Sequence, residues 1–383
     1  MEYSLPYIAF LSILGICTIL FEYTEDEKKK WNITAVAITV FYVFFAFRGY
    51  VYSDWTSYAA LLKDVEWSDI FIIHKDNAVV IEPGFTLLCC LCAVVTREYA
   101  FLVIVITTID LVLFLRFLKH WEIRNVAFAM MMLVSFEGVE MMFNLLRNQV
   151  AIFIFLNSLD YIIKRKPLPY FLLCLSALSF HLSSLLFFPL YFFLNRRINK
   201  WVYALIFFSF LLFFFSKVSL ATTIINLLNL EGPLAEKAAF YTENLTVRRT
   251  ISIASTLEQV MLIGLIVAYY NRITESFRGG ICVINSLLLF FFFYFIFAEF
   301  KEFSTRLAIL FVFSYWIIWI YLFKSLNLES NKIMMVCVLF MYCGYMSIHR
   351  YYKPIQEYDN LLFGAKSQVE RQKIFNKTFE TDE

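Results

Sequence analysis

The sequence predicts an all-helical polytopic membrane protein with about twelve transmembrane helices. Hydrophobic residues make up 61% of the 383 residues and aromatic residues 20%, whereas soluble domains are about 45–50% apolar. Apolar runs of about 17–25 residues, the length that crosses a bilayer as a helix, recur along the chain. A transmembrane barrel would instead alternate in segments of about ten residues. The net charge of +2 gives no global bias toward nucleic acid.

Each expected span is an apolar run bounded by charged or polar residues. The first run has neither a basic segment before it nor a small-residue cleavage site, so we interpret it as a span and not as a signal peptide. The run at 84–95 is too short to cross comfortably and is expected to be re-entrant or interfacial. The expected spans are 5–21, 32–47, 99–115, 126–143, 149–163, 168–182, 183–194, 201–216, 251–270, 280–297, 303–323 and 333–348.

Neither a repeat nor a glycine-rich linker divides the chain. We therefore expect one membrane domain over 1–348, with external loops at 48–98 and 217–250. Residues 349–383 are expected to form a C-terminal tail. This tail carries six basic residues of its own, which oppose an outward orientation, although loop charge has less influence away from the span ends.

Loop charge predicts the orientation in the membrane. With the spans above, six short basic loops fall on one side, and the positive-inside rule makes that side cytoplasmic. Both termini and the two long loops then face outward. The basic residues of these loops are Lys28, Lys29, Lys30, Arg116, Lys119, Arg124, Lys164, Arg165, Lys166, Arg196, Arg197, Lys200, Arg272, Arg278, Lys324 and Lys332.

The eight cysteines do not predict a metal site. Most lie in apolar runs, where cysteine behaves as a small hydrophobic residue. Cys89 and Cys92 have a C-x-x-C spacing, but no second pair or nearby histidine completes a ligand set. We interpret them as buried thiols.

Polar residues that are costly to place in a membrane gather near the span ends that this topology puts outside. The topology was derived from other residues, the basic loops, so their coincidence on one side predicts a polar cavity open to the outside. Arg147 lies between two apolar segments in MMFNLLRNQVAIFIFL, where an arginine costs energy unless it is paired or snorkels. These outer residues are Arg48, Asp54, Tyr58, Glu82, Asn144, Arg147, His181, Arg248, Arg249, Glu299, Glu302 and Arg306.

Structural explanations remain open for several of these residues. Glu302 and Arg306 are spaced to form an ion pair along one helix face. His181 can bond backbone at a helix end, and Asp54 can cap a turn. Arg48 can snorkel to lipid headgroups.

Five segments in order resemble the EpsG family, the Wzy-type polymerases of bacterial exopolysaccharide, capsule and O-antigen synthesis. The segments are FRGYVYSDWTSY, IEPGF, LLRNQVAIFIFL, LSFHLSSLLFFPLYF and EFSTRLAILF, within about residues 40–320. The most specific feature is Arg147 and Gln149 at the start of a helix, followed about thirty residues later by FHLSSL around His181. Ser53 stands where the family pattern often has a glycine before Asp54.

The resemblance implies a C-type glycosyltransferase-like membrane fold. It implies that oligosaccharide repeat units carried on undecaprenyl diphosphate are polymerised at the outer face of the bacterial cytoplasmic membrane. The implied partners are these lipid-linked oligosaccharides, the lipid bilayer, a chain-length regulator and a flippase, and no cofactor or metal is expected.

The chemistry of such a transfer assigns roles to the outer residues. A diphosphate leaving group needs positive charge where negative charge develops, and arginine supplies paired hydrogen bonds to phosphate. We assign Arg147, Arg306 and Arg48 to the diphosphate. The acceptor hydroxyl needs a base, for which His181, Glu82 and Asp54 are the candidates. Further candidates for substrate contact are Gln149, Tyr58, Glu299, Glu302, Arg248 and Arg249.

Two other functions remain open. An O-antigen ligase, or another lipid-linked glycan transferase, would share the donor, but ligases usually carry one much larger external loop than 217–250. A flippase or transporter would place charged residues near the midplane, often within internal repeats. In this sequence the charged residues cluster at one face and no repeat is visible.

Overall fold

The computed structural model describes residues 2–71, 81–218 and 248–380. In these residues the fold is helical, and the only β-type pairing is an isolated bridge between Arg48 and Asn360. Most of the predicted external loop 217–250 lies outside the described residues. The chain divides into two compact units, which we describe separately: unit 1, Met1–Phe188 with Leu326–Glu383, and unit 2, Pro189–Ser325.

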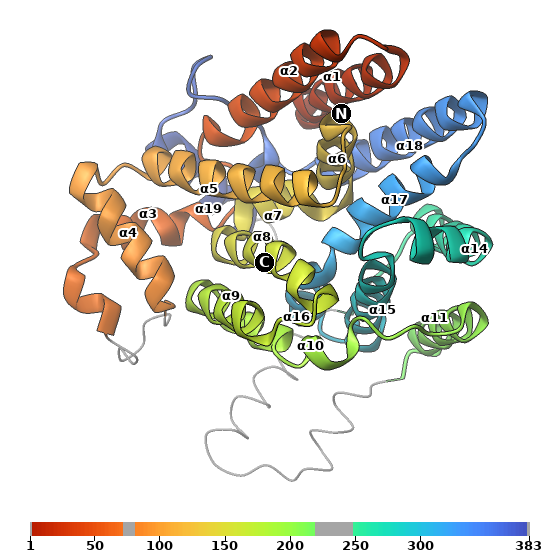
Figure 1. Cartoon of the computed structure of the whole chain (residues 1–383). Coiled ribbons are helices and arrows are strands. Elements are labelled where there is room, and N and C mark those ends of the chain that lie inside the picture. Colours follow the sequence, from red (N-terminus) through yellow and green to blue (C-terminus); the bar gives the residue numbers. More distant parts are fainter. Residues whose placement is uncertain (1, 72–80, 219–247, 381–383) are drawn as a thin grey trace. The chain divides into compact units, whose positions relative to one another are not determined.

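Unit 1 is a bundle in which helices pack both against sequence neighbours and against helices far apart in the chain (Figure 1). Helix α1 packs against α2, α6 and α18, and α8 packs against α5 and α9. The short α4 packs against α9. The helices of this unit are α1 (Leu5–Tyr23), α2 (Glu27–Ala46), α3 (Trp55–Asp64), α4 (Pro83–Val95), α5 (Tyr99–His120), α6 (Val126–Leu133), α7 (Val139–Asn144), α8 (Leu146–Ile163), α9 (Pro167–Phe180), α18 (Glu329–Arg350) and α19 (Gln368–Glu380), with 3-10 turns at Glu2–Ser4, Trp67–Phe71, Leu182–Phe187 and Pro354–Gln356.

Local sequence signals account for several helix starts. The Asp26 side chain accepts hydrogen bonds from the backbone of Lys28 and Lys29 and so caps α2. Pro167 begins α9 at the position where a missing N–H costs nothing. Asn125 caps α6 through the backbone N–H of Phe128.

The predicted span 126–143 is interrupted. Between α6 and α7 the chain makes a π turn, Val134–Gly138, in which Glu137 has φ 58 and ψ −4. Such turns break the regular hydrogen-bond ladder and are frequent at functional sites. The Glu137 carboxylate pairs with Arg350 of α18 at 3.0 Å, so the kink is tied to the last long helix of the unit.

The C-terminal tail folds back onto the end of α2. Gly49 N–H donates to the carbonyl of Asp359 at 3.0 Å, and Leu361 N–H donates to the carbonyl of Phe47 at 2.7 Å. The ring of Tyr358 stacks on Phe44 with centroids 4.2 Å apart. The tail is therefore an ordered part of unit 1 wherever it is described.

Unit 2 contains six helices in its described residues. Helix α15 packs against α11, α14, α16 and α17. The predicted span 303–323 is bent by 47° between α16 and α17. The helices are α10 (Leu190–Phe193), α11 (Lys200–Phe215), α14 (Ile253–Ser276), α15 (Gly280–Ile296), α16 (Lys301–Ala308) and α17 (Phe313–Ser325), with a 3-10 turn at Ile309–Phe311.

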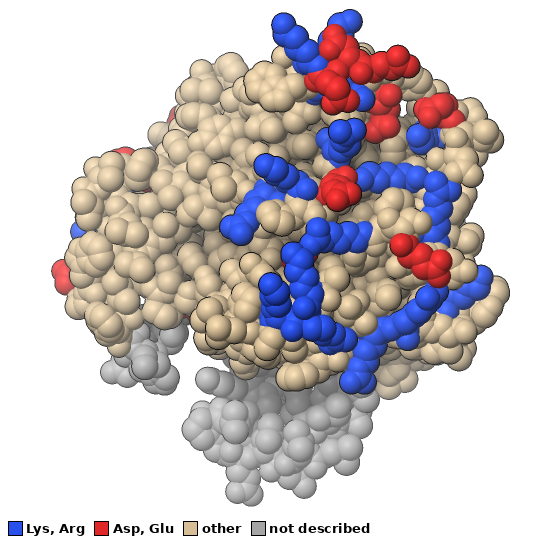
Figure 2. Space-filling model, in the orientation of Figure 1, with Lys and Arg blue, Asp and Glu red and all other residues tan. Residues whose placement is uncertain are grey.

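Every apolar run predicted as a span is helical. Within the described residues, five helices are long and apolar enough to cross a membrane, and six are if the bent pair Lys301–Phe311 and Phe313–Ser325 is one span. Wide areas of the surface in Figure 2 carry no charged side chain, as a lipid-facing surface requires. The protein is thus an all-helical membrane protein, and the number of twelve spans stays a prediction.

Candidate active site

Glu82 is the centre of a polar cluster in unit 1. One carboxylate oxygen accepts a hydrogen bond from Arg147 Nη1 at 2.7 Å. The other lies 3.1 Å from His181 Nδ1 and accepts from the backbone N–H of Leu182 at 2.8 Å. The Glu82 side chain is 12% exposed and that of Arg147 19%. Three of the predicted site residues therefore share one partly buried contact.

Each member of this cluster lies at a helix end. Glu82 is the N-cap of α4, in extended conformation, and Pro83 begins the helix. Arg147 is the second residue of α8. The non-helical residue Leu145 (φ −109, ψ 53) separates α7 from α8. His181 ends α9 in an extended conformation. Because each residue lies where a helix begins or ends, its side chain can contact residues of another helix.

Gly84 allows the two helix ends to meet. A Cβ at this position would lie 2.8 Å from the backbone oxygen of Ser179 and 2.4 Å from its Oγ. Only glycine lets α4 approach α9 this closely. The approach brings Glu82 within reach of His181.

The contacts of Glu82 keep its carboxyl ionised. Burial raises the pKa of Glu82, but the hydrogen bond with His181, the charge of Arg147 and the Leu182 N–H outweigh that effect and lower it to about 2. An ionised carboxylate accepts hydrogen bonds and donates none. His181 Nδ1 must therefore carry the hydrogen, which leaves Nε2 of a neutral His181 as an acceptor.

Tyr58 of α3 joins the cluster through Arg147. Burial raises the pKa of Tyr58 to about 12, although the positive charge of Arg147 opposes the rise. Tyr58 is therefore neutral, and Glu82 supplies the negative charge beside Arg147.

Asp54 lies at the start of α3, in a turn held by Asn144 of α7. The Asn144 side-chain oxygen accepts from the backbone N–H of Asp54 at 2.8 Å and from that of Ser53 at 3.3 Å. The residue with positive φ in this turn is Tyr52 (φ 68). The turn therefore does not require a glycine at position 53. Asp54 is positioned by the same α7–α8 junction that positions Arg147.

Gln149 follows Arg147 on α8 and is fully buried. Both polar atoms of its side-chain amide lack a hydrogen-bond partner among the described residues. A buried unsatisfied amide costs about 1–3 kcal/mol. Packing alone would therefore favour an apolar residue at position 149 over Gln149.

Arg48 is buried beneath the tail. Its side chain is 1% exposed. Nη1 donates to the carbonyl of Phe45 at 2.7 Å, and the guanidinium lies 5.1 Å from the centre of the Phe143 ring. The alternative that Arg48 snorkels to lipid headgroups does not fit this environment.

Two predicted site arginines of unit 2 form hydrogen bonds with backbone groups. Arg248 donates to the carbonyl of Lys217 at 3.0 Å and to that of Phe214 at 3.2 Å. Arg249 stacks over the ring of Tyr294 at 4.1 Å and donates its backbone N–H to Ala298. Both tie the segment before α14 to neighbouring elements.

The remaining candidates of unit 2 lie around α16. Glu299 is buried, whereas Glu302 and Arg306 are exposed. In the described part of the chain no ion pair joins Glu302 to Arg306, although their spacing allowed one. Arg306 is thus an exposed cation near a helix end.

Sequence reasoning missed some groups that the structure makes prominent. The Leu182 N–H and the role of Asn144, which was predicted only as an outer polar residue, depend on geometry that no motif discloses. Asp110 of α5 and Glu258 of α14 are buried carboxyl groups within candidate spans. A single acidic residue within an apolar run was the available signal, because such residues are functional candidates by default.

Comparison with known proteins places the chain in a family. The EpsG family, a Wzy-type polymerase family, matches residues 31–362. No curated protein and no solved structure matches the chain. The matched range includes every residue of the Glu82 cluster as well as the candidates of unit 2. Because the match covers most of the sequence, the chain belongs to the EpsG family.

Proposed function

We propose that this protein polymerises oligosaccharide repeat units carried on undecaprenyl diphosphate, at the outer face of the cytoplasmic membrane. Family membership supports the general class, a polysaccharide polymerase in a membrane. The observation that supports the chemistry is the shared carboxylate of Glu82, which holds a cation and a potential base side by side.

In the proposed reaction, Arg147 stabilises the leaving group. The bond between the anomeric carbon and the diphosphate oxygen breaks, and its electron pair stays with the diphosphate. Positive charge fixed in advance lowers the barrier to this charge build-up. Glu82 holds Arg147 through Nη1, and the buried Nε of Arg147 has no partner among the described residues.

His181 is the proposed base. An acceptor hydroxyl attacks the anomeric carbon, a new C–O bond forms, and the hydroxyl proton passes to His181 Nε2. The donated Nδ1–H bond to Glu82 keeps Nε2 free for this proton and stabilises the imidazolium that results. Glu82 is then a positioning residue, because its two oxygens are already occupied.

Other residues support this arrangement in the proposal. Asp54 lies in a turn held beside Arg147 and orients the acceptor sugar. Arg48, buried against Phe143, positions the end of α2 in place of a direct diphosphate contact. Arg306 remains our prediction for a second cation on the diphosphate, and the arginine charges make the transfer metal-independent.

Purified protein in lipid nanodiscs with a synthetic undecaprenyl-diphosphate repeat unit tests this proposal. The wild type should give a ladder of glycans with increasing numbers of repeats, while Arg147→Ala and His181→Ala should leave the single repeat unit. Arg147→Lys should restore only part of the activity, because lysine lacks the paired donors. A normal ladder from Arg147→Ala or His181→Ala would overturn the assignment.

A further inference from the structure

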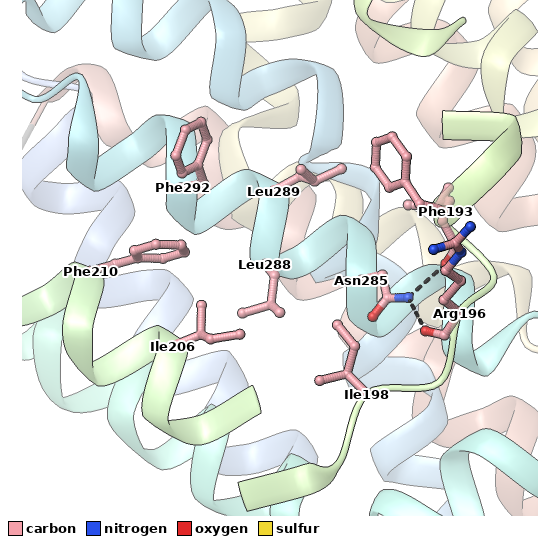
Figure 3. Close-up of a pocket in the computed structure, with 10 residues that line it drawn as sticks. Phe193, Arg196, Ile198, Ile206, Phe210, Asn285, Leu288, Leu289 and Phe292 are labelled. Atoms are coloured by element: carbon pink, nitrogen blue, oxygen red, sulfur yellow. Dashed lines mark hydrogen bonds between the residues drawn. The ribbon is translucent and has the colours of Figure 1, made fainter. Parts of the chain in front are cut away.

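Unit 2 contains an apolar groove of about 410 Å³ between α11 and α15 (Figure 3). Pockets of about 300–1,000 Å³ commonly hold small molecules. Its walls are aliphatic and aromatic side chains, and Arg196 and Asn285 lie together at one end. The apolar walls include Phe193, Ile206, Phe210, Leu288, Leu289 and Phe292.

The polar end of the groove is held in place by side chains from other helices. Asn285 Nδ2 donates to the carbonyl of Leu194 at 2.7 Å and to that of Arg196 at 2.8 Å. The hydroxyl of Tyr270 donates to the carbonyl of Ile198. The 194–198 connection is therefore fixed to α14 and α15, and so is the backbone that carries Arg196.

The two adjacent arginines in this connection differ in their partners. Arg197 pairs with Glu275 at 2.9 Å and lies over the Tyr270 ring. Arg196 is exposed, and its side chain donates only through Nε, to the carbonyl of Phe192 at 3.2 Å. Among the described residues its two terminal nitrogens have no hydrogen-bond partner. Arg196 is thus a fixed guanidinium with free donors at the end of an apolar groove.

We propose that this groove binds one anionic phospholipid, with an acyl chain between α11 and α15 and the phosphate on Arg196. Both Nδ2 hydrogens of Asn285 are already donated to backbone carbonyls. The walls away from this polar end are apolar and suit an alkyl chain. The terminal nitrogens of a guanidinium bind two phosphate oxygens at once. Loop charge predicts this end to be cytoplasmic, the side where anionic lipids attract basic residues. The proposal is independent of the glycosyl transfer proposed above.

Native mass spectrometry of the full-length protein in mild detergent tests the site. Wild type should retain one phosphatidylglycerol more tightly than phosphatidylcholine with the same chains. Arg196→Gln should weaken phosphatidylglycerol binding about fivefold and remove the headgroup preference. The adjacent Arg197→Gln is the matched control and should keep both the affinity for phosphatidylglycerol and the headgroup preference.

A second pair of variants tests the acyl-chain part. Ile206→Trp fills the groove and should abolish tight binding of both lipids, whereas Leu205→Trp, at a position 66% exposed, should not. Should Ile206→Trp fail to fold, Leu289→Phe serves in its place. The proposal is overturned if Arg196→Gln binds as the wild type does, if the groove-filling variant retains the lipid, or if undecaprenyl phosphate is held more tightly than phosphatidylglycerol.

Discussion

Glu82 and Arg147, 65 positions apart in the sequence, form an ion pair of 2.7 Å that joins the start of α4 to the start of α8. Both side chains are mostly buried, so removal of either charge would leave the other without compensation, which is strongly destabilising at buried sites. The same carboxylate fixes the tautomer of His181. One carboxylate therefore contacts both the guanidinium of Arg147 and the imidazole of His181.

Glu82→Gln should reduce the rate of glycan polymerisation by about 10²–10⁴-fold. The amide keeps the size of the side chain, but it loses the charge beside Arg147 and no longer requires the hydrogen on His181 Nδ1. The rate of ladder formation from lipid-linked repeat units measures the effect. Glu25→Gln, at an exposed position, is the control, and a Glu82→Gln rate close to that of Glu25→Gln would contradict the positioning role.

The stability contributed by Glu82 should depend on pH in a defined direction. Its pKa is lowered in the folded protein from 4.5 to about 2. The stabilisation by the ionised carboxylate is therefore fully present above about pH 5 and is lost as pH falls from about 4.5 to about 2. Its size is on the order of 3 kcal/mol. Thermal unfolding in detergent should show the wild type and Glu82→Gln converging between pH 4.5 and pH 2. Parallel curves over that range would be the contrary result.

The helices follow from the sequence more directly than the site does. Apolar runs predict helices because burial of every backbone polar group requires them in lipid, and each run is helical. The kink at Glu137 was not predicted, because it depends on the partner Arg350 in a distant helix. Helices α3 and α19 were also missed, since neither is an apolar run.

Side-chain partners were beyond the reach of sequence patterns. Loop charge predicted Glu82, Arg147 and His181 at one face of the membrane, and the structure brings these three into contact. The contact depends on the close approach of Gly84 to Ser179, which has no sequence signature. The burial of Arg48 depends in the same way on the tail, whose docking no periodicity reveals.

Gly84→Ala should impair activity through the α4–α9 contact. The added Cβ would lie 2.8 Å from a backbone oxygen of Ser179, so the helices must separate and the Glu82–His181 hydrogen bond must lengthen. Overpacking of this kind costs about 1–3 kcal/mol. The polymerisation rate and the unfolding temperature should both fall. Gly344→Ala is the control, because no atom lies within 4 Å of its added Cβ, and equal behaviour of the two variants would refute the close-approach argument.

Gly49→Ala should loosen the C-terminal tail. Its Cβ would lie 2.0 Å from Asp359 Oδ1 and 3.2 Å from the Ala365 side chain. Asp359 also pairs with buried Arg371 at 2.8 Å, so the clash disturbs the anchor of the whole tail. Limited proteolysis should cleave the tail of this variant faster than that of the wild type or of Gly344→Ala. An unchanged cleavage rate would show that the tail is held elsewhere.

The C-terminus should lie outside the cytoplasm, on the side opposite to residue 165. Helix α2 has 20 residues and is about 30 Å long. It contains a charged first turn and most of the predicted span 32–47. Its first turns carry Lys28, Lys29 and Lys30, which the positive-inside rule places in the cytoplasm, and the tail docks at its other end through Gly49 and Asp359. Reporter fusions after residues 165 and 383 should therefore report opposite sides. Because docking to the far end of α2 leaves the tail no other side, a cytoplasmic signal from both fusions would mean that α2 does not cross the membrane, and the outward orientation of the Glu82 cluster would fall with it.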